Sequence, residues 1–183
     1  KSTTTLLVGQ MLKDAGYEVF VGGNLDIPLI EYADKGNNAD FAVVEISSFQ
    51  LDTIERFRPH VAVLLNITAD HLDRYDDFAG YVRSKARIFE NQKSEDIAVI
   101  NYSDSAVKGL IAGMHSCVLP FNTDAQTPVG AWLTGKQIRI RYPDGREAWL
   151  DCRDASLLGA HNRENIGAAA LAASAVGGPL NGI

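Results

Sequence analysis

The stretch KSTTTLLVGQML, residues 1–12, decides how the fold of this chain is interpreted. Apolar residues recur at helical spacing from Leu7 to Leu12, and Gly16 follows, so an amphipathic helix is predicted over residues 2–15. A lysine and several hydroxyl residues at the start of a helix are typical of the second half of a phosphate-binding loop. Serine and threonine are also good helix N-caps, so this stretch alone leaves both interpretations open.

Four short β-branched runs follow the first helix, at residues 18–23, 40–47, 60–67 and 96–102. Continuous apolar runs of this kind, without strict alternation, are typical of parallel strands that helices cover on both faces. Helices are expected in the intervening segments, at residues 26–35, 48–57, 77–92 and 104–114. The pattern predicts an α/β fold with a mostly parallel, doubly wound sheet of the phosphate-loop type.

The pattern changes after residue 116. The runs CVLPFN, AWLT, QIRIRY and EAWLDC are separated by turn residues, and they predict a small set of antiparallel strands at one edge of the sheet. A last helix is expected over residues 163–176. We expect residues 1–176 to form one domain and residues 177–183 to be a linker.

Composition excludes several classes of function. The chain has 183 residues, a net charge of −6 and a pI near 5.1, which argue against a surface for nucleic acid or anionic membranes. Cys117 and Cys152 form no CxxC pattern, so neither a disulfide framework nor a zinc site is expected. No apolar run approaches the ~20 residues that span a bilayer, and a cytoplasmic location is expected.

Polar residues gather where the predicted strands end. Glu45 interrupts the apolar run FAVVEI, and a buried acid is costly unless it is paired or holds a cation. Asn24 follows another strand, and the loop after a third strand carries Asp70, His71 and Asp73. A single loop histidine is usually just solvated, but several such residues beside a phosphate loop favour a Mg²⁺-nucleotide site at this edge.

Lys85 lies on the apolar side of its predicted helix, four residues after Tyr81 and four before Phe89. A lysine there commonly packs its aliphatic stem and extends its ammonium to water. The alternative is functional, because burial lowers the pKa of a lysine, and a neutral amine is a nucleophile that can react with carbon dioxide.

Several motifs in this order resemble the Mur ligases, the ATP-dependent amide-forming enzymes of peptidoglycan precursor synthesis. They are VGGN at 21–24, EISSFQLD at 45–52, DHLDRY at 70–75, SKARIFEN at 84–91 and GAHNRENIGAAALA at 159–172. The resemblance covers almost the whole chain. It is strongest to the members that join D-glutamate to UDP-N-acetylmuramoyl-L-alanine.

The resemblance implies a role for each polar residue of the phosphate and metal site. Lys1 would contact the ATP phosphates, and one Mg²⁺ would be held by Glu45 with Ser2 or Thr3. A second Mg²⁺ would have ligands of its own.

For that second ion the resemblance implies His71 together with a carbamylated Lys85. Asn162 and Asn165 would approach the adenine, because an amide offers both a donor and an acceptor to a purine edge. Asn24, Ser47 and Ser48 would line the side of the muramoyl substrate.

The implied reaction activates a carboxylate by phosphoryl transfer from ATP, and the amine of D-glutamate then attacks the acyl phosphate. The alternatives are another Mur ligase, a folate polyglutamylating ligase, a phosphate-loop domain without ligase chemistry, or a purely structural α/β domain. Because the family has three domains, we expect this chain to be the central domain of a longer enzyme. Alone it is expected to be inactive and to bind ATP weakly.

Overall fold

A computed structural model of the chain describes residues 1–35, 38–69, 74–124, 127–153 and 159–177. Its strands are β1 (Val19–Gly23), β2 (Phe41–Glu45), β3 (Val61–Leu64), β4 (Ile97–Asn101), β5 (Cys117–Phe121), β6 (Gly130–Thr134), β7 (Gln137–Arg141) and β8 (Glu147–Asp151). Its helices are α1 (Ser2–Asp14), α2 (Leu29–Asp34), α3 (Ser48–Leu51), α4 (Phe78–Ala86), α5 (Ser105–Lys108) and α6 (Ala160–Ala175), with the 3₁₀ turns η1 (Arg87–Phe89) and η2 (Ile111–Gly113). The four predicted central strands are confirmed to within a few residues.

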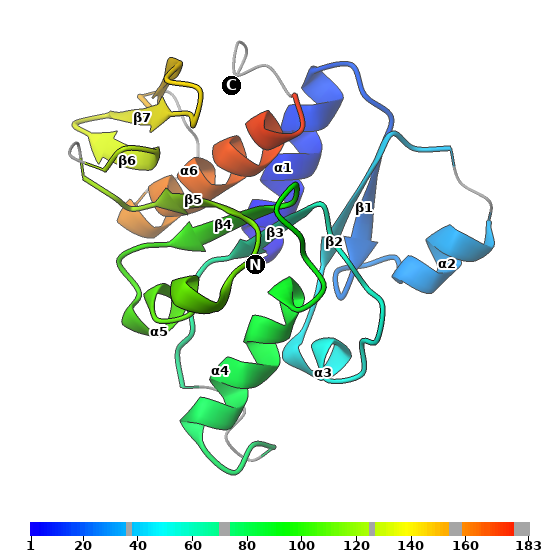
Figure 1. Ribbon diagram of the computed structural model, residues 1–183. Coiled ribbons are helices and arrows are strands. Elements are labelled where there is room, and N and C mark those ends of the chain that lie inside the picture. The colour runs from blue at the N-terminus through cyan, green and yellow to red at the C-terminus, as the bar shows by residue number, and fades with distance from the viewer. Residues whose placement is uncertain (36–37, 70–73, 125–126, 154–158, 178–183) are drawn as a thin grey trace.

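The strands form two sheets (Figure 1). β1 and β2 pair in parallel, with Val21 opposite Val43, and the other strands form a six-stranded sheet in the order β3-β4-β5-β6-β7-β8. In that sheet β3 to β6 are parallel neighbours, and β7 and β8 continue it antiparallel. The prediction of a mostly parallel sheet with antiparallel edge strands is confirmed, but the sheet is divided between β2 and β3.

The prediction that the CVLPFN run is antiparallel was wrong. These residues form β5, which pairs in parallel with β4, with Leu119 opposite Val99. The chain crosses from β4 to β5 through α5 and η2, and a crossover of this kind returns the next strand in the same direction. The antiparallel part begins only after β6, where short turns connect the strands.

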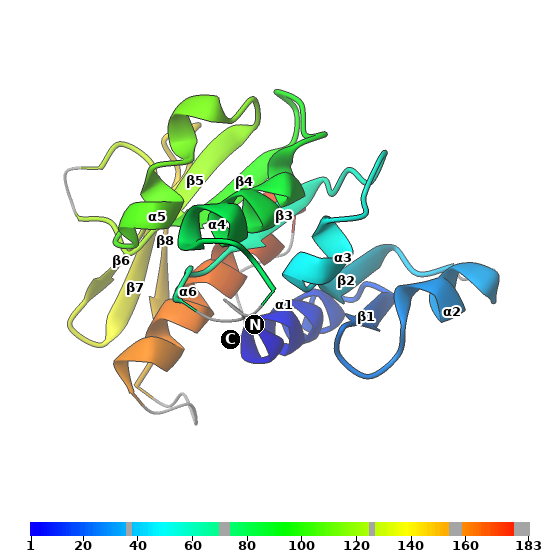
Figure 2. The ribbon, with the colours of Figure 1, turned by 90° about the horizontal axis from the view of Figure 1, so that it is seen from below.

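Helices cover both faces of the large sheet, as Figure 2 shows from below. On one face α1 and α6 lie side by side and pack against residues such as Val99, which is fully buried. On the other face α4 and α5 pack against Ala98 and Ile100, the neighbours of Val99 along β4. Alternate residues of one strand therefore serve two cores, as expected of a doubly wound sheet.

The helix predicted over residues 48–57 is a single turn. Beyond α3 the backbone carbonyls of Asp52 and Ile54 accept hydrogen bonds from the Arg87 guanidinium, and those of Glu55 and Phe57 accept from the Asn91 side chain. Side chains from the following helical region therefore take the bonds that a longer helix would make within itself. Sequence periodicity carries no sign of this tertiary capping.

Candidate functional site

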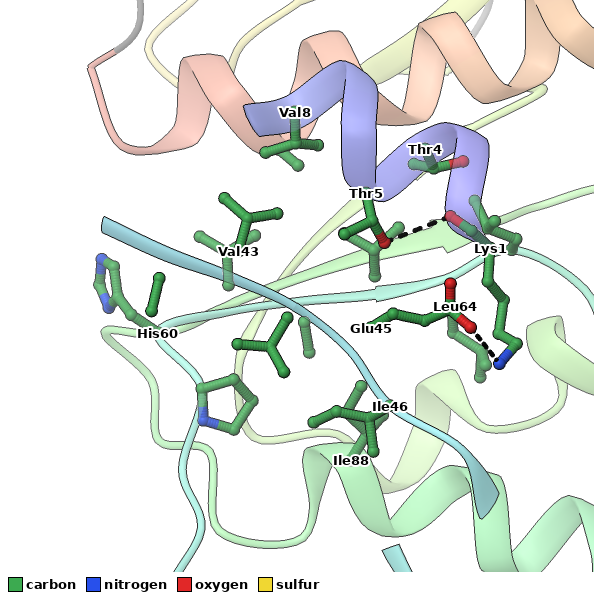
Figure 3. Close-up of a pocket in the computed structure, with 18 of the residues that line it drawn as sticks. Lys1, Thr4, Thr5, Val8, Val43, Glu45, Ile46, His60, Leu64 and Ile88 are labelled. Atoms are coloured by element: carbon green, nitrogen blue, oxygen red, sulfur yellow. Dashed lines mark hydrogen bonds and ion pairs between the residues drawn. The ribbon is translucent and has the colours of Figure 1, made fainter. Parts of the chain in front are cut away.

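A buried carboxylate stands at the carboxyl end of β2, where the sequence places Glu45. Its Oε1 accepts a hydrogen bond from Lys1 Nζ at 2.8 Å and one from Asn24 Nδ2 at 3.3 Å, while Oε2 accepts from Ser2 Oγ at 2.7 Å. Figure 3 shows the Lys1–Glu45 pair at one end of a cavity. Three residues predicted to take part in the site thus converge on a fourth.

These contacts keep Glu45 ionised. Burial raises the pKa of its carboxyl group, but hydrogen bonds from Lys1, Ser2 and Asn24 outweigh burial and hold the pKa at about 2. The carboxylate, with only 6% of its surface exposed, is a fixed negative charge at neutral pH. Such a charge suits a cation, and Lys1 supplies one here.

The turn after β1 brings Asn24 to Glu45. The Asn24 backbone N–H donates to the Glu45 carbonyl at 2.7 Å, and Gly23 immediately before it has φ of +97°. A Cβ at Gly23 would lie 2.4 Å from the Glu45 carbonyl oxygen. Only glycine permits this close approach in this conformation, which explains the second glycine of VGGN.

The N-terminus of α1 lies at the same edge. The helix has 13 residues, and its N-cap, Lys1, makes no side-chain capping bond. Ser2 at its first position faces Glu45, and Thr3 follows half-buried. Backbone N–H groups in a first turn without a side-chain cap can bind an anion, and the helix dipole favours negative charge there.

Lys85 borders the same cavity from α4. Its Nζ lies 4.8 Å from the centre of the Tyr81 ring, and Tyr81 is buried. Lys85 and Lys1 both line the cavity whose polar end holds Glu45. The helical spacing correctly placed Lys85 on the inward side of α4, and the fold brings that side to the metal-binding edge predicted from the sequence.

Asn162 and Asn165 lie in the first turns of α6, and Thr4 of α1 joins them. Thr4 Oγ1 donates to Asn165 Oδ1 at 3.1 Å, and Asn165 Nδ2 lies 3.4 Å from Asn162 Oδ1. Thr4 and Asn165 are buried, whereas Asn162 is partly exposed. Sequence reasoning did not single out Thr4, because it stands in a run of three threonines with nothing to separate them.

Ser47 and Ser48 start α3 directly after β2. Ser47 is the N-cap, and it forms a reciprocal capping box with Gln50, whose backbone N–H donates to Ser47 Oγ at 3.3 Å. Ser48 is buried, and its carbonyl accepts from Ser84 Oγ at 3.1 Å. Both serines therefore fix the turn between β2 and α3, next to Glu45.

Asp70, His71 and Asp73 lie outside the described residues. In the part of the chain that the structure describes, no three histidine, cysteine, aspartate or glutamate side chains group together as metal ligands would. In that same part, no helix has the length and apolar character needed to cross a membrane.

The family model of the Mur ligase middle domain matches residues 1–173. The chain belongs to this family. A Mur ligase middle domain therefore carries the cluster of Lys1, Ser2 and Asn24 around Glu45.

Curated relatives of this Mur ligase middle domain share one name, UDP-N-acetylmuramoylalanine–D-glutamate ligase. The protein from Desulfosudis oleivorans is 53% identical over 183 residues, which is 100% of this chain and 40% of that protein. The protein from Geotalea daltonii is 47% identical over 178 residues, 97% of this chain and 39% of that protein. The chain thus spans about two fifths of the length of these relatives.

Solved structures with the same fold include more distant Mur ligases. A UDP-N-acetylmuramoyl-L-alanyl-D-glutamate–2,6-diaminopimelate ligase superposes with a TM-score of 0.71 at 23% identity, covering 98% of this chain and 42% of that one. MurF ligase from Thermotoga maritima in complex with ADP gives 0.66 at 19% identity, covering 97% and 43%. At these identities the likeness establishes the shared fold.

Proposed function

We propose that this chain is the ATP-binding middle domain of a ligase that joins D-glutamate to UDP-N-acetylmuramoyl-L-alanine. The observation that carries the proposal is the convergence of Lys1, Ser2 and Asn24 on the ionised Glu45 at the N-terminus of α1. The name shared by relatives of 43–53% identity supports the choice of substrates. A cytoplasmic location stays a prediction.

The residues at this edge fit a magnesium nucleotide. Mg²⁺ prefers oxygen ligands, and the Glu45 carboxylate and the Ser2 hydroxyl lie 2.7 Å apart. When bound, Mg²⁺ would neutralise phosphate charge and favour transfer of the terminal phosphoryl group. Lys1 would then turn from Glu45 toward the phosphates, and the first turn of α1 would hold them through backbone N–H groups.

The other predicted residues have separate tasks in this proposal. Asn162 would contact the adenine, while the buried Asn165 would hold α6 against Thr4 of α1. Asn24, Ser47 and Ser48 would shape the substrate side of the cluster. Lys85, as a carbamate formed from its amine and carbon dioxide, would give an anionic oxygen ligand for a second Mg²⁺ with His71.

The reaction that the family resemblance implies has two steps. A carboxylate oxygen of the substrate attacks the terminal phosphorus of ATP. The acyl phosphate forms, and ADP is the leaving group. The amine of D-glutamate then attacks the acyl carbon, the amide bond forms, and phosphate departs with the acyl C–O bond broken. The domain's residues position the phosphates and screen their charge, which is the main requirement of phosphoryl transfer.

Glu45→Gln in the full-length enzyme tests the proposal directly. The change keeps the shape and removes the charge, so ligation with D-glutamate should fall by roughly 100-fold or more, the scale of losing one electrostatic stabiliser. Glu55→Gln, at an exposed glutamate, is the matched control and should stay within about twofold of the parent. Near-normal turnover by a folded Glu45→Gln enzyme would contradict the proposal that the Glu45 carboxylate binds Mg²⁺.

Lys85→Ala tests the carbamate. Turnover should be lost and partly restored by added formate or acetate, because a small carboxylate can occupy the position of the carbamate oxygens. Lys136→Ala, at an exposed lysine, should behave like the parent with and without the added acid. Full activity of Lys85→Ala without rescue would mean that this lysine only packs its stem beside Tyr81.

The choice of amino acid is tested separately. The full-length enzyme is assayed with D-glutamate, L-alanine, diaminopimelate and L-glutamate in turn, and product is expected only with D-glutamate. Product with another amino acid alone would assign the chain to a sister ligase or a folate polyglutamylating enzyme. ATP hydrolysis that is independent of any muramoyl substrate would favour a phosphate-loop domain without ligase chemistry.

A further inference from the structure

Five side chains around α3 and α4 form one chain of ring contacts, in the order Arg74, Phe49, Tyr75, Tyr81 and Lys85. Arg74 Cζ lies 4.8 Å from the centre of the Phe49 ring, and Lys85 Nζ lies 4.8 Å from that of Tyr81. The ring centres of Phe49 and Tyr75 are 6.2 Å apart, and those of Tyr75 and Tyr81 are 5.2 Å apart. Tyr75 is therefore the middle member, and it supports the ring on which Lys85 rests.

The hydroxyl group of Tyr75 makes two contacts of its own. It donates to Asp52 Oδ2 at 2.9 Å, and Ser84 Oγ lies 3.0 Å from it. Ser84 is buried, and its hydroxyl also reaches the Ser48 carbonyl oxygen at 3.1 Å. One short chain of hydrogen bonds therefore joins the α3 turn, the segment before α4, and α4 itself.

This hydrogen-bond chain connects the two elements that carry proposed metal ligands. Ser48, the first residue of α3, comes three residues after Glu45, and Ser84 directly precedes Lys85 on α4. Helices α3 and α4 pack against each other (Figure 1). A change in their spacing would therefore move Lys85 relative to Glu45.

The contact between the two elements does not depend on Tyr75 alone. The Arg87 guanidinium, one turn beyond Ser84, donates to the backbone carbonyls of Asp52 and Ile54. Loss of the Tyr75 hydroxyl would leave these bonds and the ring contacts in place, so the domain should still fold. What the hydroxyl adds is a bond to Ser84, beside Lys85.

We propose that Tyr75 is a positioning residue of the ligase, whose hydroxyl acts through Ser84 to fix the place of Lys85 relative to Glu45. The inference rests on the proposed function, because it takes Lys85 and Glu45 as ligands of the two Mg²⁺ ions. Asp52 and Ser84 already engage the hydroxyl, so Tyr75 is not itself a metal ligand. Side chains that orient metal ligands change metal affinity or activity by about 10- to 100-fold when they are substituted.

Tyr75→Phe in the full-length enzyme tests the inference, because it removes the hydroxyl and keeps the ring. The kcat for ligation should fall at least about tenfold, and the Mg²⁺ concentration that gives half the maximal rate should rise about tenfold. The KM for D-glutamate should stay within about twofold, because a displaced metal ligand weakens the transition state rather than uniform substrate binding. A hydroxyl that only stabilised the fold would lower the urea midpoint and leave the Mg²⁺ dependence unchanged.

The carbamate of Lys85 gives a second measurement, one that does not depend on turnover. When the neutral amine adds to carbon dioxide, a C–N bond forms and one proton leaves to water. The enzyme is supplied with ¹³C-labelled bicarbonate, Mg²⁺ and ADP, and the carbamate resonance is recorded by NMR, with Lys85→Ala to identify it. Tyr75→Phe should need about tenfold more Mg²⁺ than the parent to reach the same intensity.

Two further variants give the controls. Tyr142→Phe removes a hydroxyl that bonds Ser174 of α6, on the opposite face of the large sheet from α4, and it should keep kcat and Mg²⁺ dependence within about twofold of the parent. Ser84→Ala breaks the same chain of hydrogen bonds from the other side. The double variant of Tyr75→Phe and Ser84→Ala should lose about as much activity as Tyr75→Phe alone, because residues that act as one unit are not additive.

The outcomes separate this inference from the proposed function. Parent-like Mg²⁺ dependence and carbamate intensity in Tyr75→Phe would overturn the inference alone, as would additive losses in the double variant. A parent enzyme without any carbamate resonance would overturn the role given to Lys85 in the proposed function, and the inference with it.

Discussion

Two buried carboxylates, Glu45 and Asp96, are each held ionised by donors from elsewhere in the chain. Asp96 accepts from Arg58 Nε at 2.6 Å, from the Lys93 backbone N–H at 2.8 Å, and lies 3.1 Å from His60 Nδ1. The Arg58 hydrogen bond is the main reason that the pKa of Asp96 falls from 3.8 to about 2, although burial opposes it. Asp96 lies at the opposite end of the strands from Glu45, so its role is to tie β3 to β4.

Asp96→Asn should lower the free energy of unfolding at pH 7 by about 2 kcal/mol, the scale of a hydrogen bond to a charged group. The folded pKa lies below the unfolded value, so this stabilisation is present above about pH 4 and is lost as pH falls toward 2. Urea unfolding of both proteins from pH 7 to pH 2.5 measures the difference. Asp76→Asn, at an exposed aspartate, is the control. If the difference in free energy of unfolding between the two proteins stayed constant from pH 7 to pH 2.5, the lowered pKa of Asp96 would not be its cause.

At the scale of elements, α6 is unusual because it is buried along most of its length. The run from Ala168 to Ala173 is almost wholly excluded from solvent, since α6 packs against α1 and the large sheet. Small side chains allow α1 and the sheet to approach α6 together. The helix lacks the single apolar stripe of a surface helix, yet its alanines give it high intrinsic helix propensity.

Ala169→Leu should therefore destabilise the protein by about 1–3 kcal/mol, because three added carbons have no space in a well-packed core. Ala79→Leu makes the same change at an exposed position of α4 and should cost almost nothing, since both residues favour helices. Urea midpoints of the two variants give the comparison. Equal midpoints would show that α6 has room to repack.

At the scale of the whole molecule, the proposed nucleotide site draws on separate parts of the fold. Glu45 ends β2 of the small sheet, whereas Lys85 comes from α4, which packs on the large sheet. The backbone N–H groups in the first turn of α1 would hold phosphate between them.

Residues 1–183 should bind Mg²⁺-ATP at least about 100-fold more weakly than the full-length enzyme, as measured by calorimetry. The reason is that residues 1–183 span about two fifths of the length of their curated relatives, whose remaining parts can add contacts to the nucleotide. Micromolar affinity in residues 1–183 would contradict the prediction.

The sequence by itself determined the local elements. Continuous apolar runs predicted β1 to β4, helical spacing placed Lys85 on the inward side of α4, and the acid in FAVVEI marked the edge where Lys1 and Ser2 meet it. These features depend on neighbours within a few residues, where spacing and residue type suffice. The motif order also led to the correct family.

Tertiary structure alone decided how these pieces meet. It paired Glu45 with Lys1, 44 positions away, and gave β5 its parallel direction through a crossover. It also limited α3 to one turn, beyond which Arg87 binds the backbone carbonyls of Asp52 and Ile54. It also separated β2 from β3, which no periodicity reveals. Each outcome depends on which distant groups compete for the same hydrogen bonds or the same space, and that competition is settled only when the whole chain packs.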